Sequence, residues 1–118
     1  MSERSALLLL QDIETAILKI IRYTHGYTFS EYDADDKTRE AVERNFEIIG
    51  EAASRLPQSL KDSSPEVEWR IIKDFRNFII HEYFGINHQI IWNTIQLRLP
   101  ELLSKIKALL NSLPDDYK

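Results

Sequence analysis

The sequence predicts an all-α protein, an antiparallel bundle of four to five helices that forms one domain over residues 1–118. Apolar residues recur at spacings of three and four in long segments, which is the pattern of amphipathic helices. Only three glycines and four prolines occur, and most of them fall between those segments. No alternating strand pattern lasts four residues with turn chemistry on both sides. These observations favour a helix bundle with one hydrophobic core.

The first two predicted helices cover about residues 3–25 and 36–56. The apolar stripe of the first consists of Leu7, Leu10, Ala16, Ile17, Ile20 and Ile21. The stripe of the second consists of Ala41, Val42, Phe46, Ile49, Ala52 and Ala53. Gly26 marks the end of the first helix, and Pro57 lies just beyond the second. Two polar linkers, residues 27–36 and 58–65, are expected to lack regular structure.

The third predicted helix covers about residues 66–84, from a start at Ser63-Ser64-Pro65-Glu66 to a stop at Gly85. Asn87 then caps a fourth helical segment that runs to about Leu113. Pro100 lies inside that segment. Because proline lacks an amide donor and clashes with the preceding turn, we expect it to kink or split the segment.

Composition excludes several classes of protein. The net charge of −4 argues against a high-affinity DNA binder, which is usually basic. The absence of cysteine excludes disulfides and thiolate metal sites. No stretch approaches the ~18 apolar residues of a membrane span, and the short run Ala6 to Leu10 is flanked by acidic residues, unlike a signal peptide. We therefore expect a cytoplasmic protein that binds no membrane.

The third helix has two distinct faces when it is drawn at 100° per residue. The apolar face is expected to hold Ile71, Ile72, Phe75, Phe78 and Ile79. The opposite face is expected to hold Arg70, Lys73, Asp74, Asn77 and His81. Arg76 and Tyr83 are seven residues apart and nearly superimpose at the edge of the apolar face. Glu82 would point into that face, which predicts either that the helix loosens near His81 or that Glu82 is buried with a partner.

Asn77 and His81 are four residues apart and are neighbours on a helix, whereas Arg76 and His81 diverge by about 140°. Taken from spacing alone, a single histidine near a helix end is usually a solvated residue. No second histidine follows His81-Glu82 at metalloprotease spacing, so neither a metal site nor a cofactor is expected.

These residues resemble the motif of the HEPN superfamily of helical nucleases, in which four to six residues separate an Arg from a His and the first of them is polar. Arg76, Asn77 and His81 match it, and Tyr83 matches the narrower HepT pattern. The segments 41–52 and 69–72 are similar to further blocks of that family, and residues 12–13 and 17–21 fit its first helix. The resemblance therefore covers nearly the whole chain.

The resemblance implies a metal-independent endoribonuclease in which the 2′-hydroxyl of the RNA attacks the adjacent phosphate. His81 would exchange protons at neutral pH, Arg76 would hold phosphate oxygens, and Asn77 would orient either His81 or the scissile phosphate by hydrogen bonding. One chain offers one motif histidine, although the reaction needs both an acid and a base. A homodimer with the active site at its interface is therefore expected, in agreement with the family.

HepT proteins are toxins paired with a nucleotidyltransferase antitoxin, MntA, which transfers AMP to the motif tyrosine. By position that tyrosine is Tyr83; its alternative role is that of a packing residue with its hydroxyl at the rim. Glu47 and Glu51 are supporting candidates. They could pair with Arg76 of the neighbouring helix, or with Arg44 and Arg55 of their own helix.

Three functional hypotheses follow. The leading one is a toxin that cleaves transfer RNA or messenger RNA. The second is a non-catalytic helical module that binds and regulates a nucleotidyltransferase, which the net acidity favours. The third is a structural bundle with neither RNA nor an enzyme as a partner. The joint presence of Arg76, Asn77, His81 and Tyr83 favours catalysis, because a structural bundle does not need all four.

Overall fold

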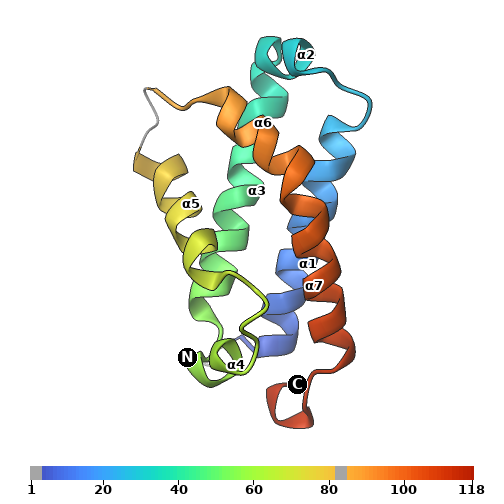
Figure 1. Ribbon diagram of the computed structural model, residues 1–118, viewed down its shortest axis with the longest axis vertical. Coiled ribbons are helices and arrows are strands. Elements are labelled where there is room, and N and C mark those ends of the chain that lie inside the picture. Colours follow the sequence, from blue (N-terminus) through green and yellow to red (C-terminus); the bar gives the residue numbers. More distant parts are fainter. Residues whose placement is uncertain (1–3, 82–84) are drawn as a thin grey trace.

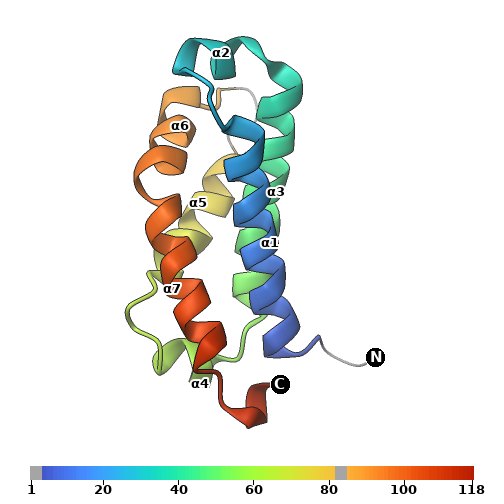
Figure 2. The same ribbon diagram turned by 90° about the vertical axis from the view of Figure 1, so that its right-hand side faces the viewer.

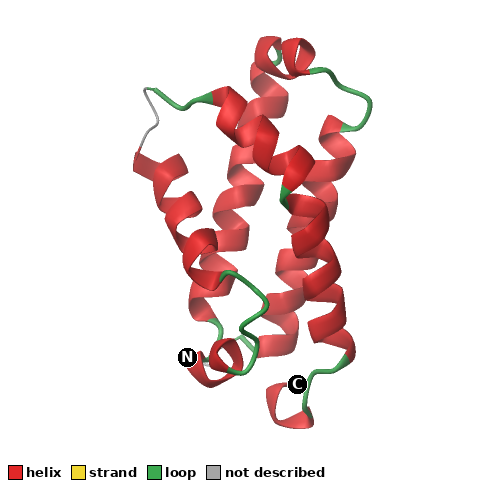
Figure 3. Cartoon of the chain, in the orientation of Figure 1, coloured by secondary structure: helices red, strands yellow, loops and turns green. Residues whose placement is uncertain are grey.

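The computed structural model describes residues 4–81 and 85–118, and every regular element within these ranges is helical (Figure 3). The longer helices are α1 (Ala6–Thr24), α3 (Asp36–Arg55), α5 (Trp69–His81), α6 (His88–Leu97) and α7 (Leu99–Asn111). Shorter ones are α2 (Phe29–Ala34), α4 (Gln58–Asp62) and the 3₁₀ helix η1 (Asp115–Tyr117). The all-α prediction is therefore confirmed.

The long helices alternate in direction, so that α1 and α5 run one way and α3 and the pair α6–α7 run the other (Figures 1 and 2). The start of α1, the helix α4 and the end of α7 lie at one end of the bundle, and α2 lies at the opposite end. The principal packing is of α1 against α3, with α5 on α3 and α7 on α1.

The centre of the bundle is filled by aliphatic side chains from α1, α3, α6 and α7. Fully buried examples are Leu10, Ile13, Ile17, Ile20, Val42, Ile91 and Ile106. In contrast, α5 contributes one buried side chain, Ile79, while Ile72, Phe75 and Phe78 are only half-buried. The helix that carries the Arg-His motif is therefore at the periphery of the core.

Several predicted boundaries are confirmed. α1 ends at Thr24, and Gly26 follows with a left-handed φ of +78°. The side chain of Asn87 caps α6 by accepting from the amides of Gln89 and Ile90. The fourth segment is split at Arg98, and Pro100 occupies the first turn of α7. Backbone amides in the first turn of a helix have no partner within the helix, so a proline there costs no hydrogen bond.

The two linkers expected to lack structure each contain a short helix, so that prediction is wrong. α2 begins with a capping box, in which Thr28 accepts from the Glu31 amide and Glu31 accepts from the Thr28 amide. α4 is only five residues long and has no side-chain cap. Both are too short for helical periodicity to appear in the sequence.

The third helix starts at Trp69, three residues later than predicted. The side chain of Val67 is buried, and the Trp69 indole Nε1 donates to the Ser64 carbonyl at 3.1 Å. These two anchors hold residues 64–68 in a turn, which delays the first helical residue.

Candidate active site

The candidate site is built on α5, which lies along α3 (Figure 1). Three aromatic rings help to hold the two helices together. Phe46 of α3 and Phe75 of α5 meet edge to face at 4.9 Å between ring centroids, and Phe78 lies 6.0 Å from Phe75. Aromatic pairs in this range stabilise a contact beyond the area that they bury. α5 is thereby fixed against α3 along the side that carries these rings.

Arg76 faces α3 directly. Its Cβ and Cγ atoms lie against the backbone of Gly50, and its Nε atom is buried with no hydrogen-bond partner among the described residues. The aliphatic stem of the side chain is therefore held by packing. No ion pair with a carboxylate of α3 fixes it within residues 4–81 and 85–118.

His81 is exposed and is the last residue of α5, while Asn77 is half-buried one turn before it. α5 is α-helical from Trp69 to His81. In a regular helix residues five apart diverge by about 140°. Since Arg76 points at α3, His81 points away from it. Within one chain the structure thus places Asn77 near His81 but does not bring Arg76 and His81 onto one face.

The remaining predicted site residues have different environments. Glu47 pairs with Arg44 of its own helix, at 3.2 Å between Arg44 Nη1 and Glu47 Oε2, so the surface alternative holds for this residue. Glu51 is exposed. Tyr83 and Glu82 lie outside the described residues, so the modification site and the two alternatives for Glu82 stay predictions.

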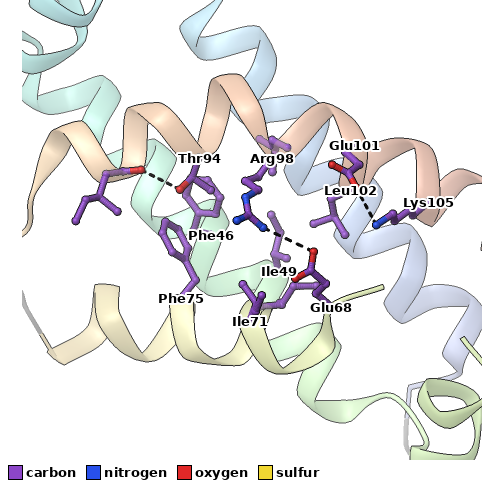
Figure 4. Close-up of a pocket in the computed structure, with 13 residues that line it drawn as sticks. Phe46, Ile49, Glu68, Ile71, Phe75, Thr94, Arg98, Glu101, Leu102 and Lys105 are labelled. Carbon is purple, nitrogen blue, oxygen red and sulfur yellow. Dashed lines mark hydrogen bonds and ion pairs between the residues drawn. The ribbon is translucent and has the colours of Figure 1, made fainter. Parts of the chain in front are cut away.

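An apolar groove of about 250 Å³ lies between α5 and the α6–α7 pair (Figure 4). Its walls include Ile71 and Phe75 from α5 and Ile90 from α6. The prediction that Ile71 is buried is wrong, since 49% of it is exposed. α5 packs mainly against α3, and the side of α5 that carries Ile71 is turned toward the groove.

Charged residues of both signs line this groove. Arg98 pairs with Glu68 across it at 3.6 Å, and Lys105 pairs with Glu101 along α7 at 2.9 Å (Figure 4). Two acidic and two basic groups therefore surround an apolar floor, and their formal charges cancel. Sequence reasoning missed this feature. Ile71 and Ile90 are among the exposed large hydrophobic residues of α5 and α6, but the sequence does not show that the two face a common groove.

A second cluster of polar side chains lies where α2, α3 and α6 meet. His88, the first residue of α6, bonds through Nδ1 to Asp33 at 2.8 Å. Burial raises the pKa of the half-buried Glu43 above its usual range, although nearby His88 and Arg39 oppose the shift. The hydroxyl of fully buried Tyr32 has no hydrogen-bond partner among the described residues. This cluster joins α2 to the start of α6.

Within the described ranges, no three or more His, Asp or Glu side chains lie together in a way that could hold a metal ion. None of the helices there combines the length and the apolar content that a membrane crossing requires.

Comparison with known proteins gives a consistent result. A family model described as "Ribonuclease HepT-like" matches residues 13–109. A protein of Methanocaldococcus jannaschii named "Putative RNase MJ0127" is 36% identical over 104 residues, which is 88% of this chain and 86% of that protein. A protein of Thermococcus cleftensis named "Probable ribonuclease HepT" is 38% identical over 100 residues, or 85% of this chain and 91% of that protein. No solved structure matches the chain.

Proposed function

Because the chain belongs to the ribonuclease HepT-like family, we propose that it is a metal-independent endoribonuclease. We propose further that it is the toxin of a toxin–antitoxin module, with transfer RNA or messenger RNA as substrate and a nucleotidyltransferase resembling MntA as partner. The observation that carries the proposal is the family match over residues 13–109, which includes the motif of Arg76, Asn77 and His81 on α5.

The proposed reaction needs two proton transfers. A base removes the proton of the RNA 2′-hydroxyl, whose oxygen attacks the adjacent phosphorus. The bond from phosphorus to the 5′-oxygen breaks, and an acid protonates that leaving oxygen. The products are a 2′,3′-cyclic phosphate and a 5′-hydroxyl end. His81 suits either transfer because an imidazole ring can both accept and donate a proton and this side chain is exposed. Arg76 would stabilise the charge that develops on the phosphate.

A homodimer would supply what one chain lacks. One copy provides one motif histidine, and Arg76 and His81 diverge on α5, whereas a two-fold axis near α5 would bring two copies of each residue together. The apolar groove beside α5 supports a second copy as its occupant. A two-fold interface sets a surface against itself, and the balanced charges of Glu68, Arg98, Glu101 and Lys105 suit such self-pairing.

We propose that Tyr83 is where the partner enzyme attaches AMP. The proposal rests on its position two residues after His81 in the family motif. Each attached group would add negative charge and bulk beside the catalytic residues, and both would oppose the approach of RNA. Mass spectrometry after incubation with the nucleotidyltransferase and ATP tests this step. An AMP-sized adduct on Tyr83 supports it, and an adduct at any other residue refutes it.

Growth and cleavage assays test the catalytic proposal. Expression of the wild type is expected to arrest growth, and the purified protein is expected to leave cyclic phosphate ends on RNA. The His81→Ala and Arg76→Ala variants are expected to do neither, and His81→Ala is expected to melt at the wild-type temperature because the histidine is exposed. A His81→Ala protein that still arrests growth would show that the histidine is not the acid or base.

Light scattering tests the dimer. Ile90→Asp places a charge in the groove and is expected to give a monomer that cleaves no RNA. Leu18→Asp is the matched control, because Leu18 on α1 is 44% exposed and Ile90 is 45% exposed. A dimeric Ile90→Asp variant would place the interface elsewhere.

The alternative function is a non-catalytic module that binds a nucleotidyltransferase. The net charge of −4 favours it, because an acidic surface repels RNA. In that case the purified dimer would cleave no RNA and would still form a complex with the nucleotidyltransferase.

A further inference from the structure

Gly50 occupies the interior of α3, where glycine is unfavourable. A residue without a side chain gives up more conformational freedom on folding than alanine does. The backbone of α3 does not require glycine there, since Gly26 is the only glycine with positive φ in the described residues. The reason for a glycine at position 50 must therefore be space.

The space is filled by Arg76. A methyl group built on Gly50 would lie 2.3 Å from Arg76 Cβ, 2.4 Å from Cγ and 3.4 Å from Cδ. Carbon atoms in ordinary contact are about 3.5–4.0 Å apart. Rotation of the arginine side chain would move Cγ but not Cβ, whose position is set by the backbone of α5. An alanine at position 50 would therefore push α5 away from α3 by about 1 Å.

Within the part of the chain that the structure describes, packing sets the direction of the arginine stem. Arg76 Nε is buried and has no hydrogen-bond partner among the described residues, so no hydrogen bond would restore its position if α5 moved. A displacement of the α5 backbone would pass along the stem to the guanidinium group. This group is the one that the proposed reaction places on the phosphate.

We propose that Gly50 is a positioning residue for Arg76, an inference that rests on the proposed ribonuclease function. The missing side chain lets α5 approach α3 closely enough to hold the guanidinium group where the scissile phosphate binds. Gly50 touches neither RNA nor His81 in this role. It acts only by fixing the arginine, and it does so once in each copy of the dimer.

Steady-state cleavage of a fluorogenic RNA tests the proposal. An error of about 1 Å in a catalytic group can cost about 100-fold in rate. Gly50→Ala is therefore expected to lower kcat by about 10- to 100-fold and to change KM much less.

Two control variants should keep the wild-type kcat. Gly85→Ala makes the same chemical change where no atom lies within 4 Å. Ile106→Val removes one buried methylene group from α7 and so lowers stability at a distance from α5.

A double-variant comparison separates positioning from general packing. Arg76→Lys keeps Cβ and Cγ but lacks the guanidinium group, so adding Gly50→Ala should lower the melting temperature as much as it does in the wild type. The additional loss of kcat should be small, because the group that Gly50 positions is absent. A Gly50→Ala protein with the wild-type kcat, or an equal loss of kcat in both backgrounds, would overturn the proposal.

Hydrogen exchange at Arg76 gives a readout that does not depend on activity. The buried Nε proton is expected to exchange slowly in the wild type and much faster in Gly50→Ala, as followed by ¹⁵N NMR. If the wild type cleaves no RNA, the proposed function fails, while this measurement still tests the contact. Unchanged exchange in a folded Gly50→Ala protein would refute the contact. If Gly50→Ala does not fold, the double variant Gly50→Ala/Arg76→Gly should fold, because it removes Arg76 Cβ and Cγ, the two clashing atoms. An unfolded double variant would refute the contact.

Discussion

The hydroxyl of Tyr32 gives the sharpest test of the packing. Tyr32 is fully buried on α2, its ring lies 5.3 Å from that of Trp92, and its hydroxyl has no hydrogen-bond partner among the described residues. Tyr32→Phe keeps the ring in place and removes one polar atom. Because that atom lost its hydration on folding without gaining a partner, its removal is expected to stabilise the protein.

The size of the effect follows from the cost of a buried unsatisfied group, about 1–3 kcal/mol. Unfolding entropy is about 2.1 cal/mol/K per residue, so for 118 residues it is roughly 250 cal/mol/K. Dividing the first quantity by the second gives an increase in melting temperature of about 4–12 °C. The raised pKa of Tyr32, caused first by its burial, agrees with a poorly solvated hydroxyl.

Thermal unfolding at neutral pH, followed by circular dichroism, measures the change. Tyr27→Phe is the matched control, because the Tyr27 hydroxyl donates to Asp35 Oδ2 at 2.8 Å and its removal should lower the melting temperature. If Tyr32→Phe instead melts several degrees below the wild type, the hydroxyl has a partner and the reasoning is wrong.

Three further predictions concern stability. Burial raises the pKa of Glu43, which means that the folded protein disfavours the charged carboxylate, and the protein loses stability as pH rises through that pKa. Glu43→Gln should therefore raise the melting temperature at pH 8 and leave it unchanged at pH 3. Hydrogen bonds donated by Thr38, and to a smaller extent by Tyr27, lower the pKa of Asp35 to about 2. The stability that these bonds give is therefore complete above pH ~4 and is lost as pH falls toward 2. Asp35→Ala should therefore flatten the acid limb of a plot of melting temperature against pH. Ile106→Ala should lower the free energy of unfolding by about 2–5 kcal/mol in urea titrations, because the side chain is fully buried.

The sequence alone predicted the helices long enough to show several turns of periodicity. It also predicted the boundaries set by local chemistry, such as the cap at Asn87 and the break at Pro100. It missed α2 and α4 because helices of six and five residues contain too few turns to show a pattern. The capping box of Thr28 and Glu31 was the one local signal of α2.

The site was harder to predict because a helical wheel has no information about neighbouring helices. It placed Arg76 correctly at the edge of the apolar face, but it could not show that Gly50 lies opposite. It also assigned Ile71 to the core, since any isoleucine on an apolar face is expected to be buried. Burial of that residue depends on whether a second helix covers that side of α5, and here the groove lies there.

The two sides of α5 therefore have different tolerances to substitution. On the side facing α3, space is limited to what Gly50 leaves open, and the proposed positioning role predicts that added bulk there moves Arg76. On the outer side His81 is exposed, and under the proposed mechanism substitutions there should change the chemistry without changing the packing. A residue that acts through position should thus affect stability and kcat together, whereas a residue that acts through proton transfer should affect kcat alone. Gly50→Ala and His81→Ala should separate in this way, and that separation would assign the inner side of α5 to positioning and the outer side to proton transfer.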